Sequence, residues 1–390
     1  MNIKSLLLGS AAALIAVSGA RAADAVTVAE PEPAEYVKIC DVYGSGYFYI
    51  PGTETCLRIG GYVRYDIGFG DVGSFDGARA TDVEDGSDNG TWLKNARFTL
   101  KTWTGQETEL GTLKTYTETR FNFGNTRFSG RYTPDDPATA ADEFAFGNGA
   151  YNKGVSLNFA WIQLGGLRVG KDESAFDTFI GYAGNVIQDT LVPYGGFDTN
   201  VVQYYFDAGN GFSAVVSLEE GYGPFTIDSY VPHVVGGVKW TQGWGAITGV
   251  VAYDSNYEEV AGKVRLDVNA TDAISLFIMA GYGTDDNYND PGFFLPAGGR
   301  GMYKLWGGNW AVWGGGTYKF NEKTSFNLQV SADDDKNVGV AANIAYDVVP
   351  GFTVTAEVDY NHAGSFPDSN WTSAEKENSW GGIVRFQRSF

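Results

Sequence analysis

Charged side chains in this chain are segregated by sign, and their spacing is the main chemistry that the sequence offers. Basic residues alternate with apolar or hydroxylated positions at Arg58, Arg64, Arg97, Lys101, Lys114, Arg120 and Arg385. Acidic residues gather in a stretch without Lys or Arg, at Asp172, Glu173, Asp177, Asp189 and Asp198. A guanidinium group keeps its charge even beside like charges. If the basic residues and the acidic residues face each other across water, they create an electric field that orders water and discriminates among polar solutes, with no bond made or broken.

Residues suited to covalent or metal chemistry are scarce. The chain has two histidines, His233 and His362, and it lacks Gly-x-Ser-x-Gly, phosphate-binding-loop and His-Glu-x-x-His motifs. The acidic run 82–86 lacks the glutamate that a calcium loop needs at its twelfth position. His233 follows Pro232 at an expected strand start, where a structural role is the usual one. The sequence therefore predicts no enzymatic activity, no cofactor and no metal site.

Composition excludes two further classes of protein. Aromatic residues make up 15% of 390 residues, and 53 residues are glycine, but no run approaches the 20 or so consecutive apolar residues that a membrane-spanning helix needs. The formal charge is −20, with 27 basic and 47 acidic residues. Nucleic acid is therefore not an expected partner, because phosphate binding requires a basic surface.

The beginning of the chain has the pattern of a secretory signal peptide. Lys4 precedes an apolar stretch from Leu6 to Val17, and Ala20-Arg21-Ala22 is a small-x-small cleavage site. We expect residues 1–22 to be removed and the mature chain to start at Ala23. Loss of Lys4 and Arg21 would then change the formal charge from −20 to −22.

The only two cysteines, Cys40 and Cys56, lie close together after this leader. An even pair at short spacing in an exported chain predicts a disulfide. We assign 23–55 to an N-terminal periplasmic segment that contains the first of these cysteines, and 56–390 to the membrane domain.

From Leu57 onward the hydrophobic pattern has a period of two, which is typical of strands with one apolar face and one water-facing face. In the first such segment Val63 and Tyr65 alternate with Arg64 and Asp66. Strands are predicted near 57–67, 94–102, 112–123, 154–164, 167–171, 200–207, 212–219, 233–240, 245–254, 259–268, 273–281, 310–320, 324–332, 337–347, 352–361 and 379–390. An even number of strands places both chain ends on the periplasmic side of an outer-membrane barrel.

The connections alternate in length, as the two rims of a barrel require. Short turns are expected at Gly165-Gly166 and Val348 to Gly351, among others, whereas long links fall at 68–91, 124–153, 172–199, 282–309 and 362–378. A soluble β-sandwich also alternates apolar and polar residues, but its strands are shorter than the 9–11 residues that cross a bilayer. Tryptophans near strand ends, expected to form interfacial girdles, are Trp92, Trp103, Trp161, Trp244, Trp310 and Trp380.

The chain ends on an aromatic residue, Phe390, at the end of an amphipathic segment. This strand must pair with 57–67, because an open sheet edge cannot lie in lipid. We expect Phe390 to be an assembly signal for the machinery that inserts outer-membrane barrels.

Two segments resemble the alphaproteobacterial porins of the Brucella type. They are Cys40-Asp41-Val42-Tyr43-Gly44-Ser45-Gly46-Tyr47-Phe48-Tyr49-Ile50-Pro51-Gly52-Thr53-Glu54-Thr55-Cys56-Leu57-Arg58 and Gly381-Gly382-Ile383-Val384-Arg385-Phe386-Gln387-Arg388-Ser389-Phe390. The resemblance implies a homotrimeric, sixteen-stranded antiparallel barrel in the outer membrane, in contact with lipid and lipopolysaccharide, that passes small hydrophilic solutes passively. It also implies that the loop after the fifth strand, Asp172 to Thr199, folds inward and constricts the pore.

On this interpretation the five acids of that loop face a wall formed by the seven basic residues. Weak charge selectivity follows, with a lean towards cations because acidic external segments such as 68–91 concentrate them. Two alternatives remain open: a structural or adhesive barrel with a closed lumen, and a solute-specific channel with a saturable site.

Overall fold

The computed structural model describes residues 38–73, 77–81, 88–126, 130–133, 143–146, 149–284, 301–364 and 376–390. Contacts divide the chain into Met1–Ile39 and Cys40–Phe390, and every strand described below belongs to the second unit. The predicted signal peptide, 1–22, lies outside the described residues, as do residues 23–37. Among the described residues, no helix is long and apolar enough to span a membrane.

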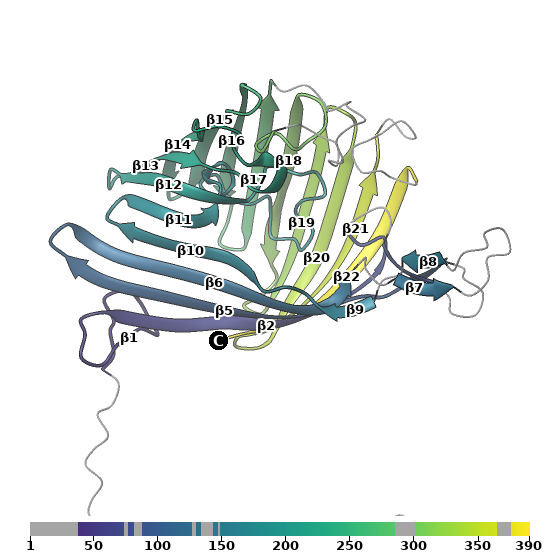
Figure 1. The fold of residues 1–390 in the computed structure, drawn as a ribbon, viewed down its shortest axis with the longest axis horizontal. Helices are drawn as coiled ribbons and strands as arrows, with labels where there is room; N and C mark the ends of the chain where they lie inside the picture. The colour runs from purple at the N-terminus through teal and green to yellow at the C-terminus, as the bar shows by residue number, and fades with distance from the viewer. Residues whose placement is uncertain are drawn as a thin grey trace, which may run out of the picture. The chain divides into compact units, whose positions relative to one another are not determined.

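Eighteen strands form one antiparallel sheet, and two of these are short pieces, β1 (Phe48–Tyr49) and β9 (Gly149–Asn152). The sixteen others succeed one another along the chain and lie side by side (Figure 1). They are β2 (Cys56–Gly70), β5 (Leu93–Thr108), β6 (Gly111–Thr126), β10 (Ser156–Leu164), β11 (Leu167–Glu173), β12 (Asp198–Asp207), β13 (Phe212–Glu219), β14 (His233–Gln242), β15 (Gly245–Asp254), β16 (Glu259–Asn269), β17 (Ile274–Gly283), β18 (Trp310–Lys319), β19 (Thr324–Asp333), β20 (Val338–Val349), β21 (Phe352–His362) and β22 (Asn378–Ser389).

The sheet closes on itself where the last strand meets the first. β22 pairs antiparallel with β2 in a register that places Val63 opposite Arg388 and Gly70 opposite Gly381. The prediction of a sixteen-stranded antiparallel barrel is confirmed. Two small hairpins lie outside this sheet, β3 (Ala78–Thr81) with β4 (Asp88–Thr91) and β7 (Gly130–Thr133) with β8 (Glu143–Phe146).

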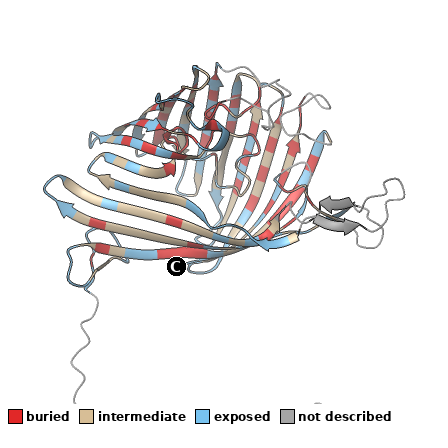
Figure 2. Cartoon of the chain, viewed as in Figure 1, coloured by how far each residue is buried: buried red, intermediate tan, exposed pale blue. Residues whose placement is uncertain are grey.

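The period of two in the sequence becomes the two faces of the barrel wall. In β2, Val63 is 54% exposed on the outer face, whereas the neighbouring Tyr62 is 8% exposed on the inner face. Buried and exposed residues alternate in this way along many strands (Figure 2). A register slip of one residue would turn every inner side chain towards lipid, so the apolar pattern fixes the register.

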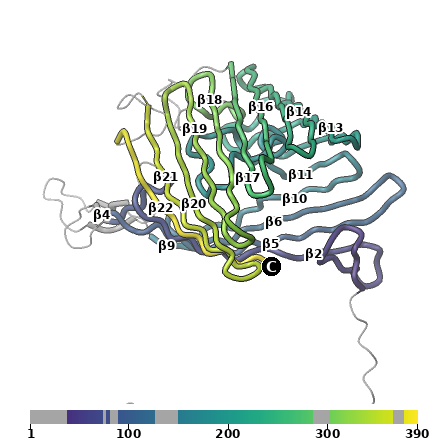
Figure 3. The backbone as a smooth tube through the Cα atoms, turned by 180° about the vertical axis from the view of Figure 1, so that it is seen from behind, coloured from purple at the N-terminus to yellow at the C-terminus, as the bar shows by residue number. Residues whose placement is uncertain are grey.

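Short turns and long links fall at opposite ends of the strands, as predicted. Gly165 and Gly166 alone connect β10 to β11, and Gly165 has a φ of +57°, a conformation that glycine adopts without strain. Figure 3 shows the succession of adjacent strands β13 to β22 from the other side.

Cys40 and Cys56 form the predicted disulfide, with 6.0 Å between their Cα atoms. Both residues are almost completely buried. The bond ties the segment before the barrel to the first residue of β2.

An apolar core occupies part of the barrel interior. Its members come from the link after β11, including Phe176, Ile180 and Tyr194, from residues 302–306, and from inner positions of β13 to β18 such as Val235 and Trp313. Parts of β15, β17 and β18 are therefore apolar on both faces, one against lipid and one against the chain's own loop, which explains near-continuous apolar stretches such as 246–253.

Candidate functional site: the inner loop and the basic wall

The link between β11 and β12, residues 174–197, runs along the inner face of the barrel, and we call it the inner loop. It opens with a short helix, α2 (Ala175–Thr178), whose N-cap Ser174 accepts a hydrogen bond from the backbone N–H of Phe176 at 3.1 Å. Of the five acids predicted for this loop, only Asp177 and Asp189 belong to it. Asp172 and Glu173 end β11 and Asp198 begins β12, because these strands extend further than the sequence pattern indicated.

Asp177 differs most from its predicted role. Its side chain is fully buried, and its Oδ1 accepts a hydrogen bond from Lys263 Nζ on β16 at 2.5 Å. Burial raises the pKa of Asp177 to about 7, against the opposing effect of the Lys263 charge. A carboxylate enclosed in this way does not line a water-filled pore, so the expectation that Asp177 faces the lumen is wrong.

Asp189 is the acid of the inner loop that remains half-buried. Tyr194 donates its hydroxyl to Asp189 Oδ2 at 2.6 Å, and Gln329 Nε2 donates to the Asp189 carbonyl at 2.7 Å. Burial raises the pKa of this carboxyl to about 6, while the Tyr194 hydrogen bond opposes the rise and the charges of Glu357 and Glu173 add to it.

The loop is fastened to the wall mainly through its backbone. Arg265 Nη1 donates to the carbonyls of Gly181 at 3.2 Å and Tyr182 at 2.6 Å. Glu357 on β21 accepts from the N–H groups of Ile187 at 2.5 Å and Gln188 at 2.8 Å. The loop therefore crosses the inner face from β11 towards β21.

The three remaining predicted acids have close partners near the start of the loop. Asp172 Oδ2 lies 2.7 Å from Arg168 Nη1, Asp198 forms an ion pair with Lys171, and Glu173 accepts the hydroxyl of Tyr182. The charges of Asp172 and Asp198 are thus compensated by basic side chains of β11, whereas Glu173 accepts a hydrogen bond from a neutral hydroxyl.

Five of the seven predicted basic residues form a contiguous group on β2, β5, β6 and β22. Arg64 stands directly opposite Arg97 in the β2–β5 register, and Arg385 stands opposite Asp66. Arg64 Nε donates to Gln387 Oε1 at 2.9 Å and Arg97 Nε to Asn122 Oδ1 at 2.8 Å. Within the described part of the chain neither Arg64 nor Arg97 has a carboxylate partner.

The other members of this group are tied to acids that lie among them. Glu118, which is nearly buried, lies 3.1 Å from Lys101 Nζ and 2.7 Å from Arg120 Nη2. Asp66 accepts from Arg385 Nε at 2.8 Å. The five residues form what we call the basic wall: Arg64, Arg97, Lys101, Arg120 and Arg385.

Arg58 and Lys114 lie apart from the basic wall, near the short-turn ends of their strands. Their cross-strand partners in β5 are Trp103 and Gly105. Both side chains are exposed. They face the same side as the wall but at another depth.

Two of the six tryptophans predicted for the interfacial girdles instead face the lumen. Trp103 lies under Arg58 at 4.5 Å and stacks on Tyr116 with ring centroids 5.4 Å apart. The ring centroids of Trp161 and Tyr116 are 5.7 Å apart, and Arg168 Cζ lies 4.0 Å from the centroid of the Trp161 ring. Trp92, Trp244, Trp310 and Trp380 are exposed, as girdle residues would be. We call the lumenal group Arg58, Trp103, Tyr116, Trp161 and Arg168 the aromatic stack.

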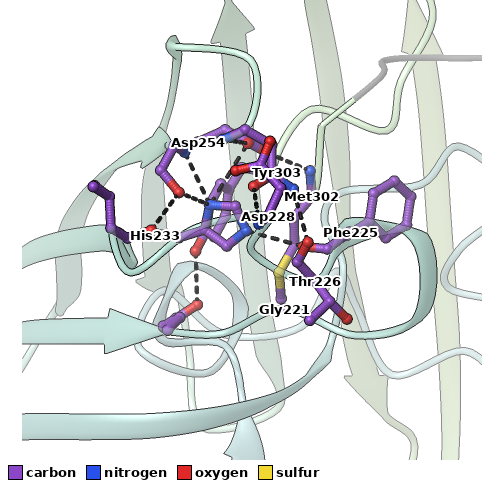
Figure 4. A network of polar contacts seen from close by, with 12 residues as sticks. Gly221, Phe225, Thr226, Asp228, His233, Asp254, Met302 and Tyr303 are labelled. Carbon is purple, nitrogen blue, oxygen red and sulfur yellow. Dashed lines mark hydrogen bonds and ion pairs between the residues drawn. The ribbon is translucent and has the colours of Figure 1, made fainter.

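His233 lies in a buried polar network at the start of β14 (Figure 4). Its Nδ1 accepts from the N–H of Ser255 at 3.0 Å, which leaves Nε2 to donate to the Phe225 carbonyl at 3.0 Å. Asp254 in turn accepts from the N–H of Met302 at 2.8 Å. The histidine thus joins separate links at the long-loop end of the barrel, and its two nitrogens are used in structural bonds.

Residues that hold the inner loop were on the water-facing side of the predicted strands, but nothing marked them individually. Lys263 and Arg265 alternate with Val264 and Leu266, and Glu357 alternates with Val358. The local signal that could have pointed to this role is Lys263 itself, a lysine at an inner position of β16 between β15 and β17, whose inner faces are largely apolar.

Comparison with known proteins agrees with this geometry. The chain matches the family model described as the porin subfamily over residues 24–383. It is 51% identical to Porin Omp2a of Brucella melitensis and to Porin Omp2b of Brucella abortus, with the whole of each chain covered.

Solved structures with the same fold are more distant in sequence. The outer-membrane channel DcaP of Acinetobacter baumannii superposes with a TM-score of 0.57 at 17% identity, covering 88% of this chain and 99% of that one. OprB of Pseudomonas putida gives 0.54 at 11% identity, covering 86% and 94%. Identity over the full length and the closed barrel together place the chain in the porin subfamily, whose members are outer-membrane channels.

Proposed function

We propose that this porin is a passive diffusion channel for small hydrophilic solutes and ions, with a constriction between the inner loop and the basic wall. The proposal rests on one observation. The inner loop is held on the face formed by β13 to β21, and Arg64 and Arg97 lie on β2 and β5 without a carboxylate partner in the described part of the chain.

A transverse electric field would follow from this arrangement. Asp189 supplies negative charge on the inner loop, and Arg64 and Arg97 supply positive charge on β2 and β5. Such a field favours polar solutes over apolar ones of the same size. Acidic external segments and the formal charge of −20 favour cations weakly at the entrance.

Selectivity in a salt gradient tests the field. In a planar bilayer, the double variant Arg64→Gln/Arg97→Gln should move the reversal potential towards stronger cation preference by several millivolts, because it removes two positive charges that have no carboxylate partner among the described residues. Arg388→Gln is the matched control, since Arg388 is an exposed arginine that donates to the Pro350 carbonyl. Equal reversal potentials for wild type, the double variant and the control would contradict the proposal.

The aromatic stack supports a second candidate, a channel with a preferred solute. The interior of a membrane barrel is generally polar, and here two arginines lie over lumenal tryptophan rings. A ring-bearing solute with a carboxylate would find both apolar edges and guanidinium donors. Concentration-dependent block of the current by benzoate, lost in Trp103→Ala, would favour this candidate over simple diffusion.

For assembly, we propose a homotrimer in contact with outer-membrane lipid and lipopolysaccharide, delivered after removal of residues 1–22. The trimer rests on family resemblance. Insertion through the barrel-assembly machinery is proposed to use the C-terminal strand, whose last residue is Phe390.

A further inference from the structure

Lys263 is a lysine whose side chain is fully buried inside the barrel. Its Nζ donates to Asp177 Oδ1 at 2.5 Å and to the Tyr194 carbonyl at 2.7 Å. The ammonium also lies 4.0 Å from the centre of the Phe176 ring. Buried lysines are rare unless they are paired, because the desolvation of the charge is costly.

The two hydrogen-bond acceptors of Lys263 come from opposite ends of the inner loop. Asp177 lies four residues after Glu173, the last residue of β11, and Tyr194 lies four residues before Asp198, the first residue of β12. One ammonium group therefore joins the outgoing and returning arms of the loop at their base, which we call the neck, and fixes both to β16.

The remaining surroundings of Asp177 leave no substitute for Lys263. The charges of Glu219 on β13 and Glu173 on β11 both oppose ionisation of Asp177, and its Oδ2 has no hydrogen-bond partner among the described atoms. Lys263 provides the only ion pair of Asp177 in the described part of the chain.

Space at the neck is also restricted. A Cβ added at Gly195 would come within 2.4 Å of Asp177 Oδ1, the oxygen that Lys263 holds. A glycine next to Tyr194 thus allows the returning arm to pass close to the carboxylate.

We propose that Lys263 is a positioning residue that sets the width of the channel from behind the inner loop, without contact with solutes. This inference rests on the proposed channel function. It predicts that the neck contact controls whether the loop stays against the β13–β21 face, while the selectivity charges lie elsewhere.

Conductance tests the effect on the pore. Lys263→Met keeps the length of the side chain but removes the cation, and single-channel conductance should rise about twofold, with added noise, since current scales with open cross-section. Larger neutral polyethylene glycols should enter. Lys239→Met is the control, because Lys239 also faces inward, on β14, and the change of charge is the same.

Accessibility tests the loop independently of conduction. The chain has two cysteines and both are in the disulfide, so Ile180→Cys supplies one free thiol in the buried part of the loop. Lys263→Met should speed its reaction with a maleimide about tenfold or more, by favouring local opening. If no variant conducts but labelling still accelerates, the channel function fails and the positioning role stands.

A second variant disturbs the neck without changing charge, in case Lys263→Met does not fold. Gly195→Ala should displace the Asp177 carboxylate and reproduce the faster labelling and higher conductance. Gly249→Ala is its control, because a Cβ there meets nothing closer than 3.9 Å. Wild-type labelling, conductance and polymer cut-off in folded Gly195→Ala or in folded Lys263→Met would overturn the inference.

Discussion

Arg64 and Arg97 stand directly opposite each other on neighbouring strands, and each donates to an amide oxygen. Like charges at opposed positions of a sheet are destabilising. Nearby tyrosine and amide groups lessen this repulsion: the guanidinium of Arg64 lies 4.6 Å from the Tyr62 ring. Two adjacent guanidinium groups that lack a carboxylate partner among the described residues are consistent with the proposed field across the lumen.

Asp189 should make ion selectivity depend on pH. Its pKa is raised to about 6, so the carboxylate is charged at pH 8 and neutral at pH 5. Cation preference should therefore decrease as pH falls through 6, and Asp189→Asn should remove that step in reversal-potential measurements. A step of unchanged size in Asp189→Asn would assign it to another group.

The raised pKa of Asp189 also makes the docking of the inner loop on the barrel wall depend on pH. A carboxyl whose pKa is raised in the docked state binds its proton more tightly there than in the released, solvated state. Protonation of Asp189 therefore stabilises the docked loop progressively as the pH falls from 6 towards the ordinary carboxyl pKa. Above pH 7 this carboxyl is ionised in both states and adds no stabilisation of the docked loop. Labelling of Ile180→Cys should slow over the acidic interval, with Asp189→Asn showing less pH dependence.

At the scale of elements, the seam between β22 and β2 depends on the chain terminus. The N–H of Phe390 donates to the Gly61 carbonyl and the N–H of Gly61 to the Phe390 carbonyl, both at 3.1 Å. Deletion of Phe390 removes both bonds, each worth about 1 kcal/mol, at an edge that lipid cannot solvate.

Deletion of Phe390 should therefore lower the yield of heat-resistant barrel on gels several-fold. Phe390→Leu retains the backbone bonds and an apolar side chain, so it separates pairing from recognition of the aromatic ring. Full assembly of the deletion variant would show that neither matters. Assembly of Phe390→Leu at wild-type yield would assign the effect to backbone pairing.

Strands were predictable because lipid and water impose a period of two, and the sixteen predicted segments correspond to the sixteen long strands. The inner loop was located but its chemistry was not, because its partners come from β16, β19 and β21, more than sixty residues away in sequence. Asp177 shows the limit: a loop carboxylate suggests exposure until its buried lysine is known. Trp103 shows a similar limit, because an aromatic residue near a strand end can face either lipid or the lumen, and the sequence alone does not say which.

Across the whole molecule, charge and apolar packing divide the lumen. The part formed by β13 to β18 is covered inside by the apolar core and the inner loop. The part formed by β2, β5, β6 and β22 presents the basic wall. A channel with one filled side and one charged side follows from a single chain that folds into its own barrel.

The interior core also constrains the order of folding. Phe176, Trp306 and Trp313 belong to a packed cluster enclosed by the wall, and bulky rings dock more readily on an open, curved sheet than through a narrow mouth. The strands that close the barrel, β2 and β22, are the first and last of the sixteen long strands in the sequence. Burial of the tryptophans should consequently precede formation of the heat-resistant state during refolding. On this order of events, the sheet first packs around the inner loop, and β2 then pairs with β22.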